Sequence, residues 1–183
     1  PRTTTTRRCC TNSDVSFERR CVNIDGSSST GESRVRLHMT PDALRDALSE
    51  PWVHGTHLNA QNLRFSAPVV LDGLTLCSFD LTGAVFEQGL SAKGATFRGM
   101  SWLKGAQRRG TFDLSGAIFR NDIRLDGLSA DVVRLSGVRA EGVIDLDDAR
   151  MGALHLDQGI CLANVSLARA QVAGVLNLNQ SDL

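Results

Sequence analysis

The sequence predicts an all-β fold, a solenoid of short parallel strands preceded by one short helix. From Leu58 to Leu183 the chain repeats the pattern Φ-x-Φ-x-x-s-x-Φ, where Φ is apolar and s is usually small. Successive units start ten or eleven residues apart, as at 58, 69, 79 and 90, so two units sum to 21 residues. The apolar pairs recur at a step of five, which excludes both an amphipathic helix and a coiled coil.

Each Φ-x-Φ pair places two side chains on one face of an extended segment. A short extended piece, a turn and another extended piece form one part of a polygonal coil. Four such sides need about twenty residues, so a repeat of 21 is one full coil with one extra residue at a corner. Matching positions in successive coils then stack about 4.8 Å apart. We therefore predict a solenoid over residues 58–183 with about six coils.

The repeat also predicts the stacked side chains of the core. One inward column is expected to hold Phe79, Met100, Ile123, Ile144 and Val165. The predicted core comprises Phe79, Leu81, Phe86, Phe97, Trp102, Phe112, Leu114, Phe119, Leu125, Leu135, Leu146, Leu156, Leu167 and Leu178. Cys161 falls on an inward position, and we interpret it as a small buried apolar residue.

The stretches FDLTGAVF, GATFRGM, FDLSGAIFRN and LDGLSADVVRLSG resemble the pentapeptide-repeat family, whose repeat is A(D/N)LXX. The resemblance covers about two-thirds of the chain. It implies a right-handed quadrilateral β-helix. Two departures from the family pattern are present: a corner residue is added in nearly every coil, and the small position often holds Leu, Val or Gly. They predict either coils less square than the family average or a divergent branch of the family.

The region before the repeat divides into two parts. Residues 1–38 form a Thr/Ser/Arg-rich leader, which we expect to be flexible. Residues 39–57 form a capping helix and a junction. Thr40 is a good N-cap and Pro41 suits the first helical position, so we predict a helix over about 41–49 that covers the open first coil.

Composition narrows the class of protein. The formal net charge is zero, which gives no overall field that favours nucleic acid, and we expect no direct nucleic-acid binding. We expect no membrane span, because no apolar run is long enough. Five cysteines without paired spacing suit a reducing compartment: the bacterial cytosol, or a host cytosol after secretion.

Two charged segments are the candidate partner-binding sites. The first is basic and comprises Lys104, Gln107, Arg108 and Arg109; the step from Met100 to Phe112 there is twelve residues. One interpretation is a bulged loop that contacts a partner. The other is a tolerated insertion whose space Trp102 fills.

The second segment is acidic and comprises Asp145, Asp147 and Asp148. In a subset of the family, an acidic rod that mimics DNA binds DNA gyrase and relieves quinolone poisoning. The resemblance makes gyrase a candidate partner here. Arginines such as Arg124 and Arg150 interrupt the acidic faces, however, and ordinary solvated turns are the alternative.

No motif for catalysis, a metal or a cofactor emerges. His54 and His57 have an HxxH spacing without the third ligand that zinc requires. There is no Gly-rich phosphate loop and no Ser/His/Asp grouping. We therefore expect no enzyme, no metal and no cofactor.

The leading functional hypothesis is a non-catalytic module that presents flat β-helix faces to a protein partner of unknown identity. A DNA-mimicking regulator of DNA gyrase is one alternative. A secreted bacterial effector, with the leader as its export signal, is another. The resemblance also suggests a homodimer through the C-terminal coil.

Overall fold

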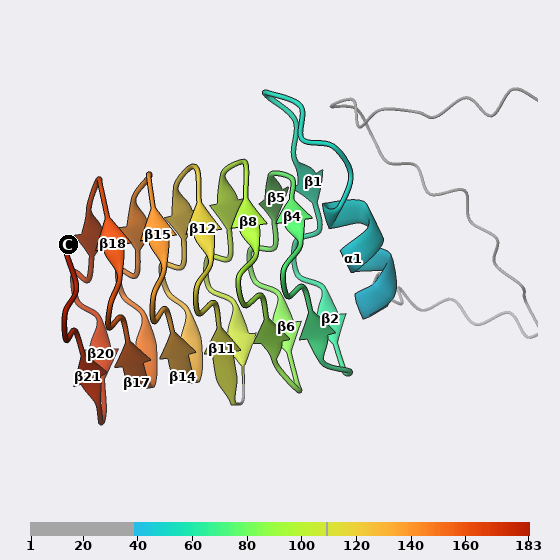
Figure 1. Cartoon of the computed structure of the whole chain (residues 1–183). Helices are drawn as coiled ribbons and strands as arrows, with labels where there is room; N and C mark the ends of the chain where they lie inside the picture. The colour runs from blue at the N-terminus through green and yellow to red at the C-terminus, as the bar shows by residue number, and fades with distance from the viewer. Residues whose placement is uncertain (1–38, 109) are drawn as a thin grey trace, which may run out of the picture.

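The computed structural model describes residues 39–108 and 110–183, with no description of the Arg108 side chain, and the predicted leader lies outside them. Helix α1 (Pro41–Leu48) stands at one end of a row of stacked coils, and the C-terminus lies at the other end (Figure 1). The fold prediction of an all-β solenoid with one short helix is confirmed. Within the described residues, no helix has the length and apolar character required to cross a bilayer.

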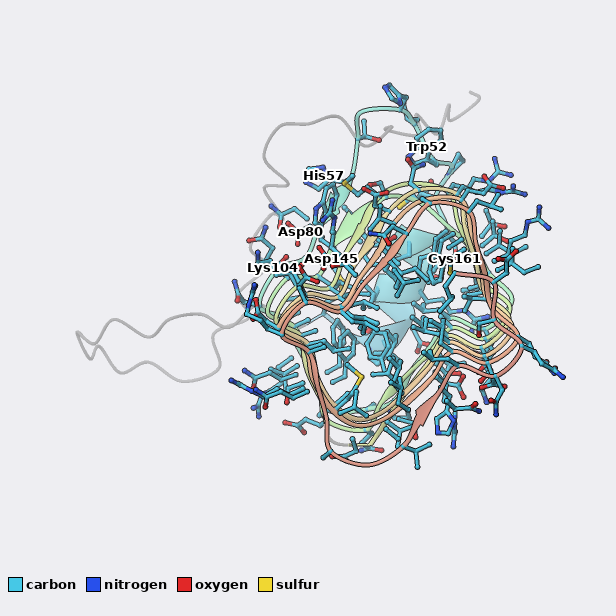
Figure 2. All side chains as sticks on the ribbon, turned by 90° about the vertical axis from the view of Figure 1, so that its left-hand side faces the viewer. Trp52, His57, Asp80, Lys104, Asp145 and Cys161 are labelled. Atoms are coloured by element: carbon cyan, nitrogen blue, oxygen red, sulfur yellow. The ribbon has the colours of Figure 1, made fainter. Side chains whose placement is uncertain are left out.

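Helix α1 starts where the sequence predicts. The Thr40 hydroxyl accepts a hydrogen bond from the Ala43 amide at 3.1 Å, and Pro41 occupies the first turn. Leu44 and Leu48 are fully buried against the first coil. Figure 2 looks along the coils from the other end and shows α1 lying behind their interior. The helix therefore covers one open end of the stack, as predicted.

Each coil contributes parallel strands that pair with the strands about 21 residues before and after them. The strands form three sheets, which we name A, B and C. Sheet A contains β1 (Leu58–Asn59), β5 (Phe79–Asp80), β9 (Ser101–Trp102), β13 (Ile123–Arg124), β16 (Ile144–Asp145) and β19 (Val165–Ser166). Sheet C contains β4 (Thr75–Leu76), β8 (Thr96–Phe97), β12 (Ile118–Phe119), β15 (Arg139–Ala140) and β18 (Ile160–Cys161).

Sheet B covers two sides of the stack because two of its strands continue around a corner. These are β14 (Ser129–Arg134) and β17 (Arg150–His155). Its other strands are β2 (Arg64–Phe65), β3 (Val69–Val70), β6 (Val85–Phe86), β7 (Leu90–Ser91), β10 (Gln107–Arg108), β11 (Thr111–Asp113), β20 (Gln171–Val172) and β21 (Leu176–Asn177).

The core is the interior of the coils. Phenylalanines stack there from coil to coil, with the ring centroids of Phe97 and Phe119 4.7 Å apart. Such aromatic contacts contribute stability beyond that from the area each ring buries. The residues predicted as core that are buried are Phe79, Leu81, Phe86, Phe97, Phe112, Leu114, Phe119, Leu125, Leu135, Leu146 and Leu156. Cys161 is buried too.

Two predicted core residues lie in the last coil and are less covered. Leu167 is partly buried, and Leu178 is 38% exposed. Their inward positions are the same as in earlier coils, but no following coil packs on them. Other apolar side chains of this end are also exposed, among them Leu162, Val175 and Leu176.

The third coil corrects the predicted register by one residue. Ser101, not Met100, pairs with Phe79 and Ile123, and Leu103 takes the inward place predicted for Trp102. Trp102 is half-buried and belongs to the outward column of Asp80 and Arg124. A slip of one residue exchanges the two faces of a strand, so this single difference moves the tryptophan from the core to the surface.

Candidate functional site

The outward side of sheet A gathers most of the residues predicted to bind a partner. It consists of the outward side chain of each strand and the residues of the adjoining turns. We call it the sheet A face and define it by Asp80, Trp102, Lys104, Asp122, Arg124, Asp126, Asp145, Asp147, Asp148, Ser166 and Arg169.

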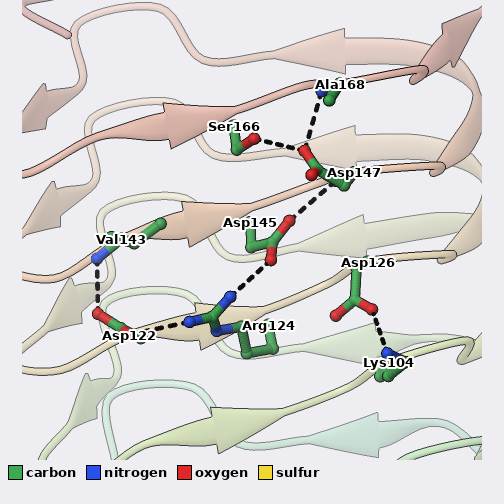
Figure 3. Close-up of polar contacts among 9 residues, drawn as sticks. All are labelled: Lys104, Asp122, Arg124, Asp126, Val143, Asp145, Asp147, Ser166 and Ala168. Atoms are coloured by element: carbon green, nitrogen blue, oxygen red, sulfur yellow. Dashed lines mark hydrogen bonds and ion pairs between the residues drawn. The ribbon is translucent and has the colours of Figure 1, made fainter.

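A guanidinium joins two carboxylates on this face. The Arg124 Nη1 atom donates to Asp145 Oδ2 at 2.7 Å in the next coil, and Nη2 lies 3.4 Å from Asp122 Oδ2. Asp122 also accepts a hydrogen bond from the Val143 amide at 2.9 Å. Figure 3 shows these contacts running across the strands. Arg124 and Asp145 are 21 residues apart, so the coil repeat itself brings them together.

The network continues through the turns. The Asp147 amide donates to Asp145 Oδ1 at 3.0 Å, and the Asp147 carboxylate accepts from the Ser166 hydroxyl and the Ala168 amide (Figure 3). In an earlier coil, Lys104 Nζ lies 2.9 Å from Asp126 Oδ2. The side chains of this face are therefore held in fixed positions before any partner arrives, which lowers the ordering cost of binding.

Asp148 adopts an unusual backbone conformation. Its φ is 56°, in the left-handed region, whereas Gly105 and Gly127 hold the same turn position in earlier coils. Asp148 forms a two-pronged ion pair with Arg169 of the next coil, with both contacts at 2.7 Å. The geometry matches the fork-to-fork pairing that arginine makes with carboxylates.

The pairing shifts the pKa of these groups further away from neutral pH. Hydrogen bonding and charge from Asp126 raise the pKa of Lys104. Arg169 lowers the pKa of Asp148, first by its hydrogen bonds and then by its charge. The pKa of Arg124 is raised chiefly by its hydrogen bond to Asp145.

Asp80 also stays ionised. Partial burial raises its pKa, but hydrogen bonds from Thr82 and Gln61, with the nearby charge of His57, outweigh that effect and lower the pKa overall. Figure 2 places Asp80, Lys104 and Asp145 on the same side of the coils.

Trp102 gives this polar face an aromatic centre. Its ring packs against His57, with the ring centroids 5.5 Å apart. Sequence reasoning missed its outward position, although a usable signal exists. The left-handed glycine of the turn lies four residues after the first strand residue, as in Phe79 to Gly83, and the same spacing back from Gly105 gives Ser101.

The sheet A face also holds the whole excess of negative charge in residues 39–183. That span has 16 acidic and 13 basic side chains, and the face contributes six and three of them. Outside the sheet A face, residues 39–183 carry ten acidic and ten basic side chains, so their charges cancel. Sequence reasoning missed Asp122, Arg124 and Asp126, although a step of 21 or 22 residues aligns Arg124 with Asp145 and Lys104 with Asp126.

The predicted basic segment is divided between two sides. Lys104 lies on the sheet A face, whereas Gln107 and Arg108 belong to β10 in sheet B. Gln107 pairs with Val85 and is exposed, and the strand register aligns Arg108, not Gln107, with Phe86. Starting the unit at Ser101 makes the step to Phe112 eleven residues, so the predicted step of twelve is wrong.

This corner is nevertheless one residue longer in the third coil than in the fourth. Three residues separate Gln107 from Thr111, whereas two separate their partners Ser129 and Val132 in the next coil. The second coil has the same corner length as the third, because Val85 pairs with Gln107 and Leu90 with Phe112. The change therefore lies in the later coils, where β14 and β17 run through the corner.

The two histidines of the HxxH spacing make separate contacts. His54 packs edge-on against Trp52, and His57 packs against Trp102. Within residues 39–108 and 110–183, no three side chains of His, Cys, Asp or Glu are grouped to hold a metal ion.

Comparisons with known proteins add no name. No family model, no curated protein and no solved structure matches this chain.

Proposed function

We propose that this protein is a non-catalytic interaction module that binds a protein partner through the sheet A face. The partner surface that fits is basic, with an apolar or aromatic group positioned to cover Trp102. The resemblance to pentapeptide-repeat proteins supports the same reading, since it implies a flat-sided β-helix.

The observation that carries this proposal is that the sheet A face combines carboxylates held in place by hydrogen bonds with the aromatic ring of Trp102. Matching positions in successive coils repeat about every 4.8 Å. Arg124 holds the carboxylate of Asp145, and the Ala168 amide holds that of Asp147. Tryptophan is enriched among the residues that dominate binding energy at protein interfaces. A rigid face of this kind binds by surface complementarity and loses little conformational freedom on binding.

Affinity capture with matched variants tests the proposal. The sheet A variant carries Trp102→Ser, Asp126→Ser and Asp145→Ser, and the control variant carries Ile118→Ser, Arg139→Ser and Ile160→Ser on the outward side of sheet C. We expect proteins captured by the wild type and by the control to be lost with the sheet A variant. Loss with the control alone, or equal capture by all three, would contradict the proposal.

A DNA-mimicking regulator of DNA gyrase is the second proposal. The carboxylates of Asp122, Asp126, Asp145 and Asp147 line one side of a rod, which supports it. Lys104 and Arg124 lie among them and reduce the net charge that a basic DNA-binding surface would meet. A DNA supercoiling assay with purified gyrase tests this proposal. Inhibition of gyrase by the wild type that is lost in the sheet A variant would favour DNA mimicry.

Self-association through the last coil is compatible with either role. Leu162 is 62% exposed, and Val175 and Leu176 are each more than half exposed. Apolar side chains gathered at one end favour a covering surface, and we propose that a second copy provides it. Sedimentation equilibrium of the wild type and of a Leu162→Ser, Leu176→Ser variant tests this, with a dimer expected for the wild type alone.

A further inference from the structure

A hollow on sheet B differs from the sheet A face, because it combines two cations with a partly apolar wall. It lies over β3, β7, β11 and β14 and has a volume of about 260 Å³. The lining residues that matter here are Val70, Ser91, Lys93, Thr111, Asp113 and Arg134. They come from the first four coils, so the coil repeat builds the hollow from residues far apart in the sequence.

One carboxylate lies between two cations in this hollow. Asp113 is only 7% exposed, and its Oδ1 accepts from the Ser115 hydroxyl at 2.7 Å and from the Ser115 amide at 3.1 Å. Its Oδ2 lies 3.4 Å from Lys93 Nζ and 3.8 Å from Arg134 Nη1. Two positive groups therefore share a single oxygen through long contacts.

Both cations retain donors for a ligand. In the part of the chain that the structure describes, neither head group has another ion pair or side-chain hydrogen bond, and the Thr111 hydroxyl has none either. Asp72 is a further carboxylate beside them, and it accepts from the Ser91 hydroxyl at 2.6 Å and from the Lys93 backbone amide at 2.8 Å. The hollow thus presents two cations and a hydroxyl that can all donate to one oxyanion.

The wall of the hollow is partly apolar. Val70 is 48% exposed there, and Pro68 lies beside it. A phosphate gains nothing from such a wall, whereas the methylene groups of an aliphatic carboxylate can cover it.

We propose that this hollow is a binding site for a carboxylate attached to a short aliphatic chain. The carboxylate lies between Lys93 and Arg134 and accepts from both, and the aliphatic part packs on Val70. Asp113 lies between the two cations and competes with the ligand for them. The source is either a free small acid or a glutamate side chain of a protein. The site lies on a different sheet from the sheet A face. Its test therefore gives a result that does not depend on the function proposed above.

Amide chemical shifts of the full chain, followed during titration at constant ionic strength, test this site. The probes are butyrate, inorganic phosphate and a short peptide with one central glutamate and blocked ends. We expect saturable shifts at residues 88–93 and 111–113 with butyrate or the peptide, and the tighter of the two identifies the source. Binding of phosphate alone, or shifts that never saturate, would overturn the proposal.

Four variants, one of them a control, sharpen the result. Lys93→Gln and Arg134→Gln should each weaken carboxylate binding at least tenfold, while Arg139→Gln, on sheet C, should leave it unchanged. Asp113→Asn keeps Oδ1 as an acceptor and removes the competing negative charge, so it should bind the carboxylate about threefold more tightly. If Asp113 only holds the cations in place, that variant would instead bind more weakly and have a lower melting temperature. Equal affinities in the wild type and all four variants would refute the site.

Discussion

Sheets A and C have the same backbone architecture, but their outward side chains differ in charge. Both are parallel ladders of two-residue strands that repeat with the coil, and both bury alternate side chains in a common core. The outward column of sheet A is charged and networked. The outward column of sheet C reads Thr75, Thr96, Ile118, Arg139 and Ile160, with a single charge.

The comparison separates the inward residues, which build the fold, from the outward residues, which form the surface. Inward residues such as Ile144 in sheet A and Phe119 in sheet C are fully buried, and both pack into the common core. Outward residues are free to differ, because a β-solenoid does not need them for packing. The concentration of net charge on one sheet is therefore the feature that calls for a functional explanation.

The largest expected effect comes from placing a charge on the inward side. Leu146→Asp should lower the free energy of unfolding by about 4 kcal/mol or more, because it leaves an unpaired charge in the stack. Ile118→Asp, outward on sheet C, should cost only about 1 kcal/mol. Urea unfolding followed by circular dichroism measures both, and a Leu146→Asp variant as stable as Ile118→Asp would show that the inward register is wrong.

The two faces should also differ in how salt affects binding. Attraction between the sheet A face and a basic partner is screened by ions. Raising the ionic strength from 50 to 500 mM should therefore weaken partner binding by roughly tenfold. The Asp126→Ser, Asp145→Ser variant should show a much shallower dependence, and Arg139→Gln should behave as the wild type. Isothermal titration calorimetry gives the affinities, and salt-independent binding by the wild type would argue against an electrostatic interface.

A smaller effect concerns acid stability, which involves sheet A but not the outward column of sheet C. The pKa of Asp80 is lowered in the folded protein, as its hydrogen bonds outweigh its partial burial. Its contribution to stability is therefore present above the unfolded pKa of about 3.9, and it is lost as the pH falls through the folded value. Asp80→Asn should flatten the decline in unfolding free energy between pH 5 and pH 2. An unchanged slope would mean that Asp80 gains nothing from Thr82 and Gln61.

The smallest effect is that of one ion pair. A double-mutant cycle on Arg124 and Asp145, each changed to alanine, should give a coupling energy below about 1 kcal/mol, because the Arg124 side chain is 38% exposed. A coupling of several kcal/mol would assign this network to the fold rather than to the surface, and would blur the contrast between the two sheets.

Sequence periodicity predicted the fold class, the capping helix and most of the core, because the coil imposes its spacing on inward residues. It predicted the wrong register in the third coil. There Met100 and Trp102 form an apolar alternation that is shifted by one residue from the inward positions of Ser101 and Leu103. The turn at Gly105 decides between them, since its left-handed conformation fixes the start of the strand at Ser101. The sequence also predicted Lys104, Asp145, Asp147 and Asp148 as contact residues, but it could not show which outward residues share a side without the strand register.

Site-specific photo-crosslinking tests the central claim most directly. A photoreactive amino acid is placed at position 102 on sheet A or at position 118 on sheet C, and the two full-length proteins are irradiated in cells or lysate. We expect a discrete crosslinked partner from position 102 and none from position 118. A partner captured equally from both positions, or only from position 118, would contradict the assignment of the sheet A face as the binding surface.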